Sequence, residues 1–263
     1  MTLSFHVRHE VTFDRAKEVL FAVARGETYE DVLQSKRQIT RLRQLGLVID
    51  NRLTALGEAV SILCEAKPDL WGDLSHFCHY TLWQPQKSAE NGFAWTYRAF
   101  VNRIWFLDNF QINVNTLEPI VSTLINEIEA EACFEVEETR KAVVSLSWRS
   151  LKGVLNWLDG VVPPVIENET LTRRYFCPPE LALLAAGWVA QQTEGELGID
   201  FLLTPERREM ICKVCLLDPM ALDRVLDWTL PLYPEVMVAG TNAGVYGRFL
   251  RFLKWPESSD LLR

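Results

Sequence analysis

The chain has 263 residues, of which 48% are hydrophobic and 24% charged, a composition ordinary for a globular protein and unlike that of disordered or collagen-like chains. No apolar run approaches the roughly 20 residues that a membrane-spanning helix needs, and the N-terminus lacks the continuous apolar stretch of a secretory signal. These features predict a cytoplasmic protein with no membrane partner, and the net charge of −8 argues against a general polyanion binder held by bulk electrostatics.

The N-terminal third has the pattern of a winged helix, a helix-turn-helix variant that ends in a β-hairpin. Gly26 and Gly46 end the first and the third of its expected helices, and Thr28 and Ser35 are suited to begin the second and the third. In chain order, the expected elements are helices over 13–25, 28–33 and 36–45, a hairpin around an Asp-Asn turn at 50–51, and a helix over 54–65.

An aromatic-rich segment follows. Residues 71–110 hold eleven of the 28 aromatic side chains, and a helix is expected over 94–108. Basic residues are sparse there, which favours a packing hub over a stacking platform for single-stranded nucleic acid.

Two later stretches repeat the helix-and-hairpin order more loosely. Their expected helices cover 116–132, 136–146 and 148–159, then 179–191, 205–216 and 219–230, with hairpin turns at 167–168 and 241–242. The predicted fold is therefore mainly α with short β-hairpins, built from winged-helix-like units joined by an aromatic-rich helical segment. The predicted parts are a winged-helix domain (1–66), the helical hub (67–115), a second winged-helix-like unit (116–177) and a C-terminal helical or winged-helix-like unit (178–263).

Positive charge is concentrated near the N-terminus. Residues 1–57 hold nine Lys/Arg and seven Asp/Glu, a net charge of +2. The other 206 positions hold 18 Lys/Arg and 28 Asp/Glu, a net charge of −10. Any nucleic-acid contact is therefore expected in the N-terminal winged helix, and the acidic remainder is expected to bind partner proteins.

The helix over 36–45 is the sharpest functional feature. Helical spacing places Ile39, Leu42 and Leu45 on one side, and the opposite side carries no acid. Arginine can read guanine and glutamine can read adenine in the major groove, and an arginine at the wing can reach a phosphate. The candidate contacts to double-stranded DNA are Lys36, Arg37, Thr40, Arg41, Arg43, Gln44 and Arg52.

About four to six such cations would give micromolar, salt-sensitive binding, so stable occupancy is expected to need dimerisation or a partner. The alternative is a solvated helix in a scaffold that mediates protein contacts only.

In the corresponding later helices, Arg149 and Lys152 offer a secondary DNA contact. Asp223 and Asp227 would repel phosphate, so their helix is interpreted as a docking or oligomerising surface.

A second alternative is a zinc- or thiol-dependent accessory enzyme. It would use the pairs His6/His9 and His76/His79, or the thiols Cys212 and Cys215. Packing residues surround these groups, and the sequence has no glycine-rich phosphate loop, nucleophile elbow or HExxH motif. The sequence therefore predicts no enzyme, no metal site and no cofactor.

Short motifs resemble those of a known but uncharacterised family. They are Phe5, Arg8-His9-Glu10 and Phe13, then Leu53-Thr-x-x-Gly57, then His79-Tyr80 and Leu82-Trp83, and they cover mainly residues 5–110. Members of that family are encoded in prokaryotic phage-defence islands, often beside nucleotide-sulfur-transfer-like and DNA-modifying proteins. The resemblance implies an accessory, DNA-binding component of a multi-protein anti-phage defence system.

Overall fold

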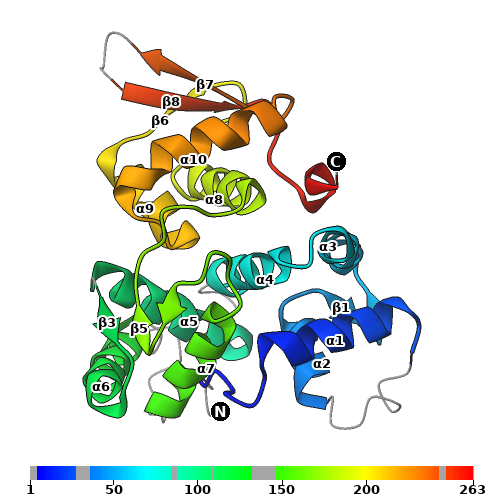
Figure 1. The fold of residues 1–263 in the computed structure, drawn as a ribbon, viewed down its shortest axis with the longest axis vertical. Coiled ribbons are helices and arrows are strands. Elements are labelled where there is room, and N and C mark those ends of the chain that lie inside the picture. Colours follow the sequence, from blue (N-terminus) through cyan, green and yellow to red (C-terminus); the bar gives the residue numbers. More distant parts are fainter. Residues whose placement is uncertain are drawn as a thin grey trace. The chain divides into compact units, whose positions relative to one another are not determined.

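The computed structural model describes residues 5–27, 36–83, 88–107, 109–131, 146–242 and 247–262. The chain divides into two compact units, Met1–Thr172 and Arg173–Arg263 (Figure 1). Both units combine helices with short antiparallel strand pairs, which confirms the predicted mainly α fold with short β-hairpins. The finer division at residues 66, 115 and 177 stays a prediction.

The N-terminal part of unit 1 follows the helix, helix, hairpin, helix order predicted for a winged helix. Its elements are α1 (Phe13–Ala24), α2 (Lys36–Gln44), β1 (Val48–Ile49), β2 (Arg52–Leu53) and α3 (Ala55–Ala66). The predicted helix over 28–33 lies outside the described residues. Asp50 and Asn51 adopt φ angles of 46° and 59°, the left-handed turn that this residue pair favours in a two-residue hairpin. Thr54 caps α3, because its hydroxyl accepts a hydrogen bond from the Gly57 N–H at 3.0 Å.

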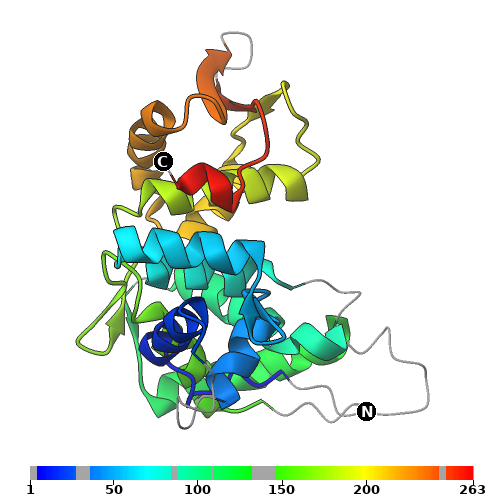
Figure 2. The ribbon, with the colours of Figure 1, turned by 90° about the vertical axis from the view of Figure 1, so that its right-hand side faces the viewer.

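Helices α1 and α2 lie side by side in both views (Figures 1 and 2). Their contact buries Val19 and Leu20 of α1 together with Ile39 and Leu42 of α2. Ile39 and Leu42 are positions that the helical spacing assigned to the buried side of the helix over 36–45, so this part of the prediction is confirmed.

The aromatic segment forms two helices, α4 (Leu70–Thr81) and α5 (Ser88–Phe106). Most of its large rings are buried, namely Trp71, Tyr80, Phe93, Trp95, Tyr97, Phe100 and Trp105. The N-terminal segment before α1 packs on this layer, because the Phe5 ring meets Trp95 edge to face at 6.0 Å and the Phe5 carbonyl accepts from the Thr96 hydroxyl at 2.7 Å. The burial of these rings places most of them in the interior of unit 1, while the role of the segment as a hub between units stays a prediction.

The remaining elements of unit 1 are β3 (Phe110–Gln111), α6 (Val114–Glu131), α7 (Trp148–Leu158), β4 (Ile166–Glu167) and β5 (Thr170–Leu171). The three strands form an antiparallel sheet in the order β3-β5-β4, so the strand after α5 pairs with the predicted hairpin some 60 positions later. The predicted helix over 136–146 lies outside the described residues.

Unit 2 contains α8 (Pro179–Gln192), β6 (Asp200–Leu202), α9 (Pro205–Cys215), α10 (Leu222–Thr229), β7 (Met237–Asn242) and β8 (Gly247–Phe252). Short 3₁₀ turns cover Pro219–Ala221, Leu230–Leu232 and Ser258–Leu261. The predicted C-terminal hairpin is β7–β8, and β6 adds a third antiparallel strand beside β8. The predicted turn at 241–242 is wrong, because Thr241 and Asn242 belong to β7 and pair with Arg248 and Gly247 of β8. Among the described helices of both units, none combines the length and the apolarity needed to cross a lipid bilayer.

Candidate nucleic-acid interface

Helix α2 presents a basic and polar face to solvent. Its exposed side chains are Lys36, Arg37, Thr40, Arg43 and Gln44. The helix itself carries no acidic residue. Five of the six candidates predicted on this helix therefore lie where a groove of DNA could reach them.

The structure contradicts the prediction at Arg41, which points into unit 1. Its side chain is only 3% exposed, and its guanidinium carbon lies 3.7 Å from the centre of the Phe93 ring in α5. The prediction from helical spacing gave α2 a single buried side, on which Ile39 and Leu42 pack against α1. Because α2 also meets the aromatic layer, its buried arc is wider and includes Arg41.

Two of the exposed arginines have partners within unit 1. Arg37 forms an ion pair with Glu10 at 3.1 Å, and Arg43 donates a hydrogen bond to the Asn51 side-chain oxygen at 2.6 Å. The second contact joins α2 to the tip of the β1–β2 wing, where Arg52 is also exposed. We call the set Lys36, Arg37, Thr40, Arg43, Gln44 and Arg52 the α2–wing surface.

Glu10 is the acid that the sequence reasoning missed on this surface. A hydrogen bond to its own backbone N–H lowers the pKa of its carboxyl, and the nearby His9 and Arg37 lower it further. Glu10 therefore stays ionised near neutral pH and partly neutralises Arg37. Exposed ion pairs of this kind contribute at most about 1 kcal/mol, so a phosphate can replace the carboxylate. No local pattern could reveal the pair, because Glu10 lies outside any helix and far from Arg37 in the chain.

The histidines of α4 lie inside the aromatic layer. His76 shares a hydrogen bond of 3.0 Å with the Tyr97 hydroxyl, and the His79 Nδ1 donates to the Ser75 carbonyl at 2.8 Å. Burial, aided by the positive charge of Arg41, lowers the pKa of His79 well below its ordinary value. His79 is therefore neutral near neutral pH, and it stacks on Tyr97 with 4.8 Å between the ring centres.

The metal and thiol alternatives gain no support from the described part of the chain. Within it, no group of three or more His, Cys, Asp or Glu side chains is placed to hold a metal ion. Cys212 and Cys215 are buried in α9, as their apolar neighbours predict. Burial raises the pKa of Cys212 to about 12 and that of Cys215 well above its ordinary value, so neither is a thiolate near neutral pH.

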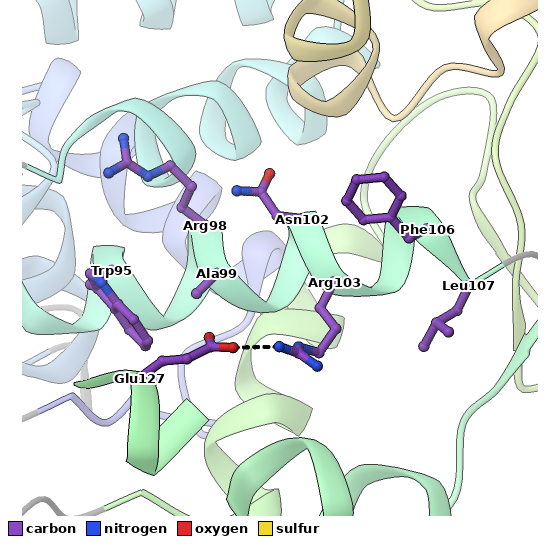
Figure 3. Close-up of a pocket in the computed structure, with 8 residues that line it drawn as sticks. All are labelled: Trp95, Arg98, Ala99, Asn102, Arg103, Phe106, Leu107 and Glu127. Carbon is purple, nitrogen blue, oxygen red and sulfur yellow. Dashed lines mark hydrogen bonds and ion pairs between the residues drawn. The ribbon is translucent and has the colours of Figure 1, made fainter. Parts of the chain in front are cut away.

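A pocket of about 530 Å³ lies along α5 and reaches α6 (Figure 3). Arg103 of α5 is ion-paired with Glu127 of α6 on one side of the pocket, while Arg98 and Asn102 point to the other side of α5 (Figure 3). Its lining residues are Trp95, Arg98, Ala99, Asn102, Arg103, Phe106, Leu107 and Glu127. The Glu127 carboxylate in this pocket is therefore already paired with Arg103.

The charged residues singled out on the two later helices lie in different environments. Arg149 and Lys152 on α7 are exposed, and the Arg149 guanidinium lies 5.7 Å from the centre of the Trp148 ring. In unit 2, Asp223 is ion-paired with Arg208 at 2.6 Å, and Asp227 is ion-paired with Arg248 at 2.7 Å. These two aspartates of α10 are therefore ion-paired with arginines of α9 and β8.

Comparison of the chain with protein-family models, with curated proteins and with solved structures gave no match.

Proposed function

We propose that this protein binds double-stranded DNA through the α2–wing surface and acts as an accessory or regulatory component rather than as an enzyme. The observation that carries the proposal is the composition of that surface. Three cations, a hydroxyl and an amide share the exposed side of α2, and Arg43 ties them to the wing that carries Arg52. This combination provides both phosphate contacts and base-edge contacts.

The dimensions of α2 suit the major groove. An α-helix with its side chains is about 10–12 Å in diameter, and the groove is about 12 Å wide. In this arrangement Gln44 faces base edges, since amides read adenine. Lys36, Arg37 and Arg43 contact the phosphates that flank the groove, and Arg52 contacts a phosphate next to the wing.

The burial of Arg41 leaves four cations on the α2–wing surface, namely Lys36, Arg37, Arg43 and Arg52. Four phosphate contacts give weak, salt-sensitive binding, so we expect stable occupancy to require dimerisation or partner subunits. The acidic remainder of the chain is suited to such partners, because it would be repelled by DNA. The family resemblance of residues 5–110 extends the proposal to a cytoplasmic role in a prokaryotic anti-phage defence complex.

A titration of the full chain into a fluorescently labelled 20-base-pair duplex tests the proposal. Four phosphate contacts predict that the association constant falls by about a hundred-fold between 50 and 200 mM NaCl. Fluorescence polarisation at the two salt concentrations measures this change. No binding at 50 mM NaCl, or an affinity that salt leaves unchanged, would contradict the proposal.

A scaffold that binds proteins but not DNA is the second candidate, and exposed apolar side chains on unit 2 favour it. Tyr175, Met220, Trp228 and Leu232 are exposed there, and Met220 is 90% exposed. Arg224 connects two of them, because it donates to the Tyr175 carbonyl at 3.2 Å and its guanidinium carbon lies 5.7 Å from the centre of the Trp228 ring. Neighbouring exposed apolar side chains are typical of protein-binding surfaces. The same titration separates the two candidates, because a pure scaffold binds no duplex at either salt concentration.

A further inference from the structure

In unit 1, a pocket of about 490 Å³ lies where the start of α6 meets α7 and the turn between β4 and β5. Helices α6 and α7 lie side by side (Figure 1). Pockets that hold small molecules have volumes of about 300–1,000 Å³, so this pocket is large enough for one. It is separate from the α2–wing surface, because the residues that line it come from 112–117, 148–159 and 166–169.

The interior of the pocket is apolar. Leu117 of α6 and Leu155 of α7 line it and are 3% and 6% exposed. Ile112, Trp148 and Ile166 are half-buried and add to the apolar lining. Burial of apolar surface is a main source of affinity for small molecules, and an aromatic ring of a ligand can also pack against the Trp148 ring. The pocket therefore favours a ligand with a large apolar part.

Two hydrogen bonds hold the sides of the pocket. The Ile112 N–H donates to the Glu169 carbonyl at 2.7 Å and joins the β4–β5 turn to the start of α6. The Asn156 side-chain nitrogen donates to the His9 carbonyl at 2.8 Å and joins α7 to the segment before α1. Because the fold itself holds these sides, the pocket needs little rearrangement to accept a ligand, which favours binding.

Charges of opposite sign lie at two positions along the pocket. Lys152 lies within α7, and Asp159 follows the last residue of the helix with helical backbone angles. They are seven positions apart, so both lie on the same face of α7, about 10 Å apart along its axis. Glu169 adds a second carboxylate from the β4–β5 turn. All three side chains are exposed, and within the described part of the chain none of them forms a hydrogen bond or an ion pair.

The two positions attract groups of opposite charge. The last carbonyls of α7 carry a partial negative charge that adds to the charge of Asp159, so this end of the pocket attracts a positive group. Lys152 lies nearer the N-terminus of the helix and attracts a negative group. A ligand that matches both positions therefore carries an ammonium group and a carboxylate, together with an apolar part for the interior.

We propose that this pocket binds a free α-amino acid with a large apolar side chain. The ammonium group of the amino acid donates to the Asp159 carboxylate, and the Lys152 ammonium donates to the carboxylate of the amino acid. An α-amino acid with one hydrogen bond at each end spans about 9 Å, which matches the separation of Lys152 and Asp159 along α7. The apolar side chain packs against Leu117 and Leu155.

Other ligands match fewer of these groups. An amine without a carboxylate leaves Lys152 as a repelling charge, and an anion without an ammonium group is repelled by Asp159 and Glu169. The ammonium group of a peptide has an amide beside it in place of the carboxylate. A free amino acid uses the lysine, the carboxylates and the apolar interior together.

Ligand-observed NMR titrations of the full chain at pH 7.5 test the site with L-phenylalanine as the probe. We expect saturable binding with a dissociation constant in the micromolar to millimolar range, and no binding of glycine, which has no apolar side chain. Phenethylamine lacks the carboxylate, and 3-phenylpropionate lacks the ammonium group. Each should bind about five- to ten-fold more weakly than L-phenylalanine, because one charged pair is lost and one charge in the pocket is left to repel the ligand.

Asp159→Asn removes the carboxylate at the end of α7 and should weaken the binding of L-phenylalanine by about three- to five-fold. Glu118→Gln is the matched control, because Glu118 is an exposed carboxylate of α6 that does not line the pocket. The change in net charge is the same, and we expect the affinity to stay unchanged. Both positions are exposed, so thermal denaturation should show a nearly unchanged Tm for both variants.

Four results would overturn the site. They are no saturable binding of L-phenylalanine, equal binding of glycine, equal binding of either analogue, and an affinity that Asp159→Asn leaves unchanged or that Glu118→Gln lowers as much. The titrations contain no DNA, so their failure and the failure of the proposed function are separate results.

Discussion

Replacing Lys36 and Arg43 with glutamate together is expected to abolish measurable binding of duplex DNA. Both side chains are exposed on α2, and the double reversal lowers the charge of this surface by four. Losing two phosphate-range contacts and adding two repulsive charges should weaken binding by at least about a hundred-fold at 50 mM NaCl. Fluorescence polarisation with the labelled duplex measures the loss. Thermal denaturation should show a nearly unchanged Tm, because exposed substitutions usually alter stability by no more than about 0.5 kcal/mol.

The double variant Arg15→Glu and Arg25→Glu is the matched control. These arginines lie on and at the end of α1, are 71% and 60% exposed, and pair only with the neighbouring Glu18 and Glu27 among the contacts described. The change in net charge is the same as in the test variant. We expect duplex affinity to fall by no more than about three-fold, since neither arginine belongs to the α2–wing surface and salt weakens the effect of exposed charges that do not contact the phosphates. An equal loss in both variants would show that binding depends on net charge and not on α2.

Gly72→Ala is expected to destabilise unit 1 strongly, although alanine is the better helix former. Gly72 lies in the first turn of α4, and a methyl group there would overlap the Gly160 carbonyl after α7. The loop cannot move away freely, because the Val162 N–H donates to the Asp73 carboxylate at 3.0 Å. Overpacking of this kind costs about 2–3 kcal/mol, which corresponds to a fall in Tm of about 5–10 °C. Thermal denaturation followed by circular dichroism measures the fall.

Ser122→Ala is the matched control for Gly72→Ala. Ser122 is exposed on α6, so the substitution also favours helix but meets no packed backbone. We expect its Tm to stay the same or to rise slightly. A rise in Tm for Gly72→Ala as well would mean that α4 and the loop after α7 do not approach as closely as the structure has them.

The N-terminal fold could be predicted because its signals are local. Glycines at 26 and 46 mark the ends of the helices, and the apolar spacing identifies the residues buried between α1 and α2. The Asp50-Asn51 pair specifies a tight turn, because both residues tolerate positive φ angles. Each of these features depends on residues a few positions apart, which is the range that a sequence pattern reports.

The parts that were missed depend on partners distant in sequence. The strands β3 and β6 have two and three residues, too few for a recognisable alternation, and each is defined by pairing with a later strand. The buried position of Arg41 depends on Phe93, and the partial neutralisation of Arg37 depends on Glu10. A helical projection shows which residues share a face of one helix. It does not show how many other elements pack against that helix. The sequence therefore predicted the exposed cations of the candidate interface. It did not predict that Arg41 is buried or that Glu10 pairs with Arg37.

Hydrogen–deuterium exchange of the full chain, with and without the 20-base-pair duplex, tests the DNA interface most directly because it reports where binding occurs. The duplex should slow amide exchange in peptides that cover residues 36–53, which span α2 and the wing, and should leave α8 and α9 of unit 2 unchanged. Protection confined to unit 2, or to unit 1 peptides outside residues 36–53, would contradict the assignment of DNA binding to the α2–wing surface.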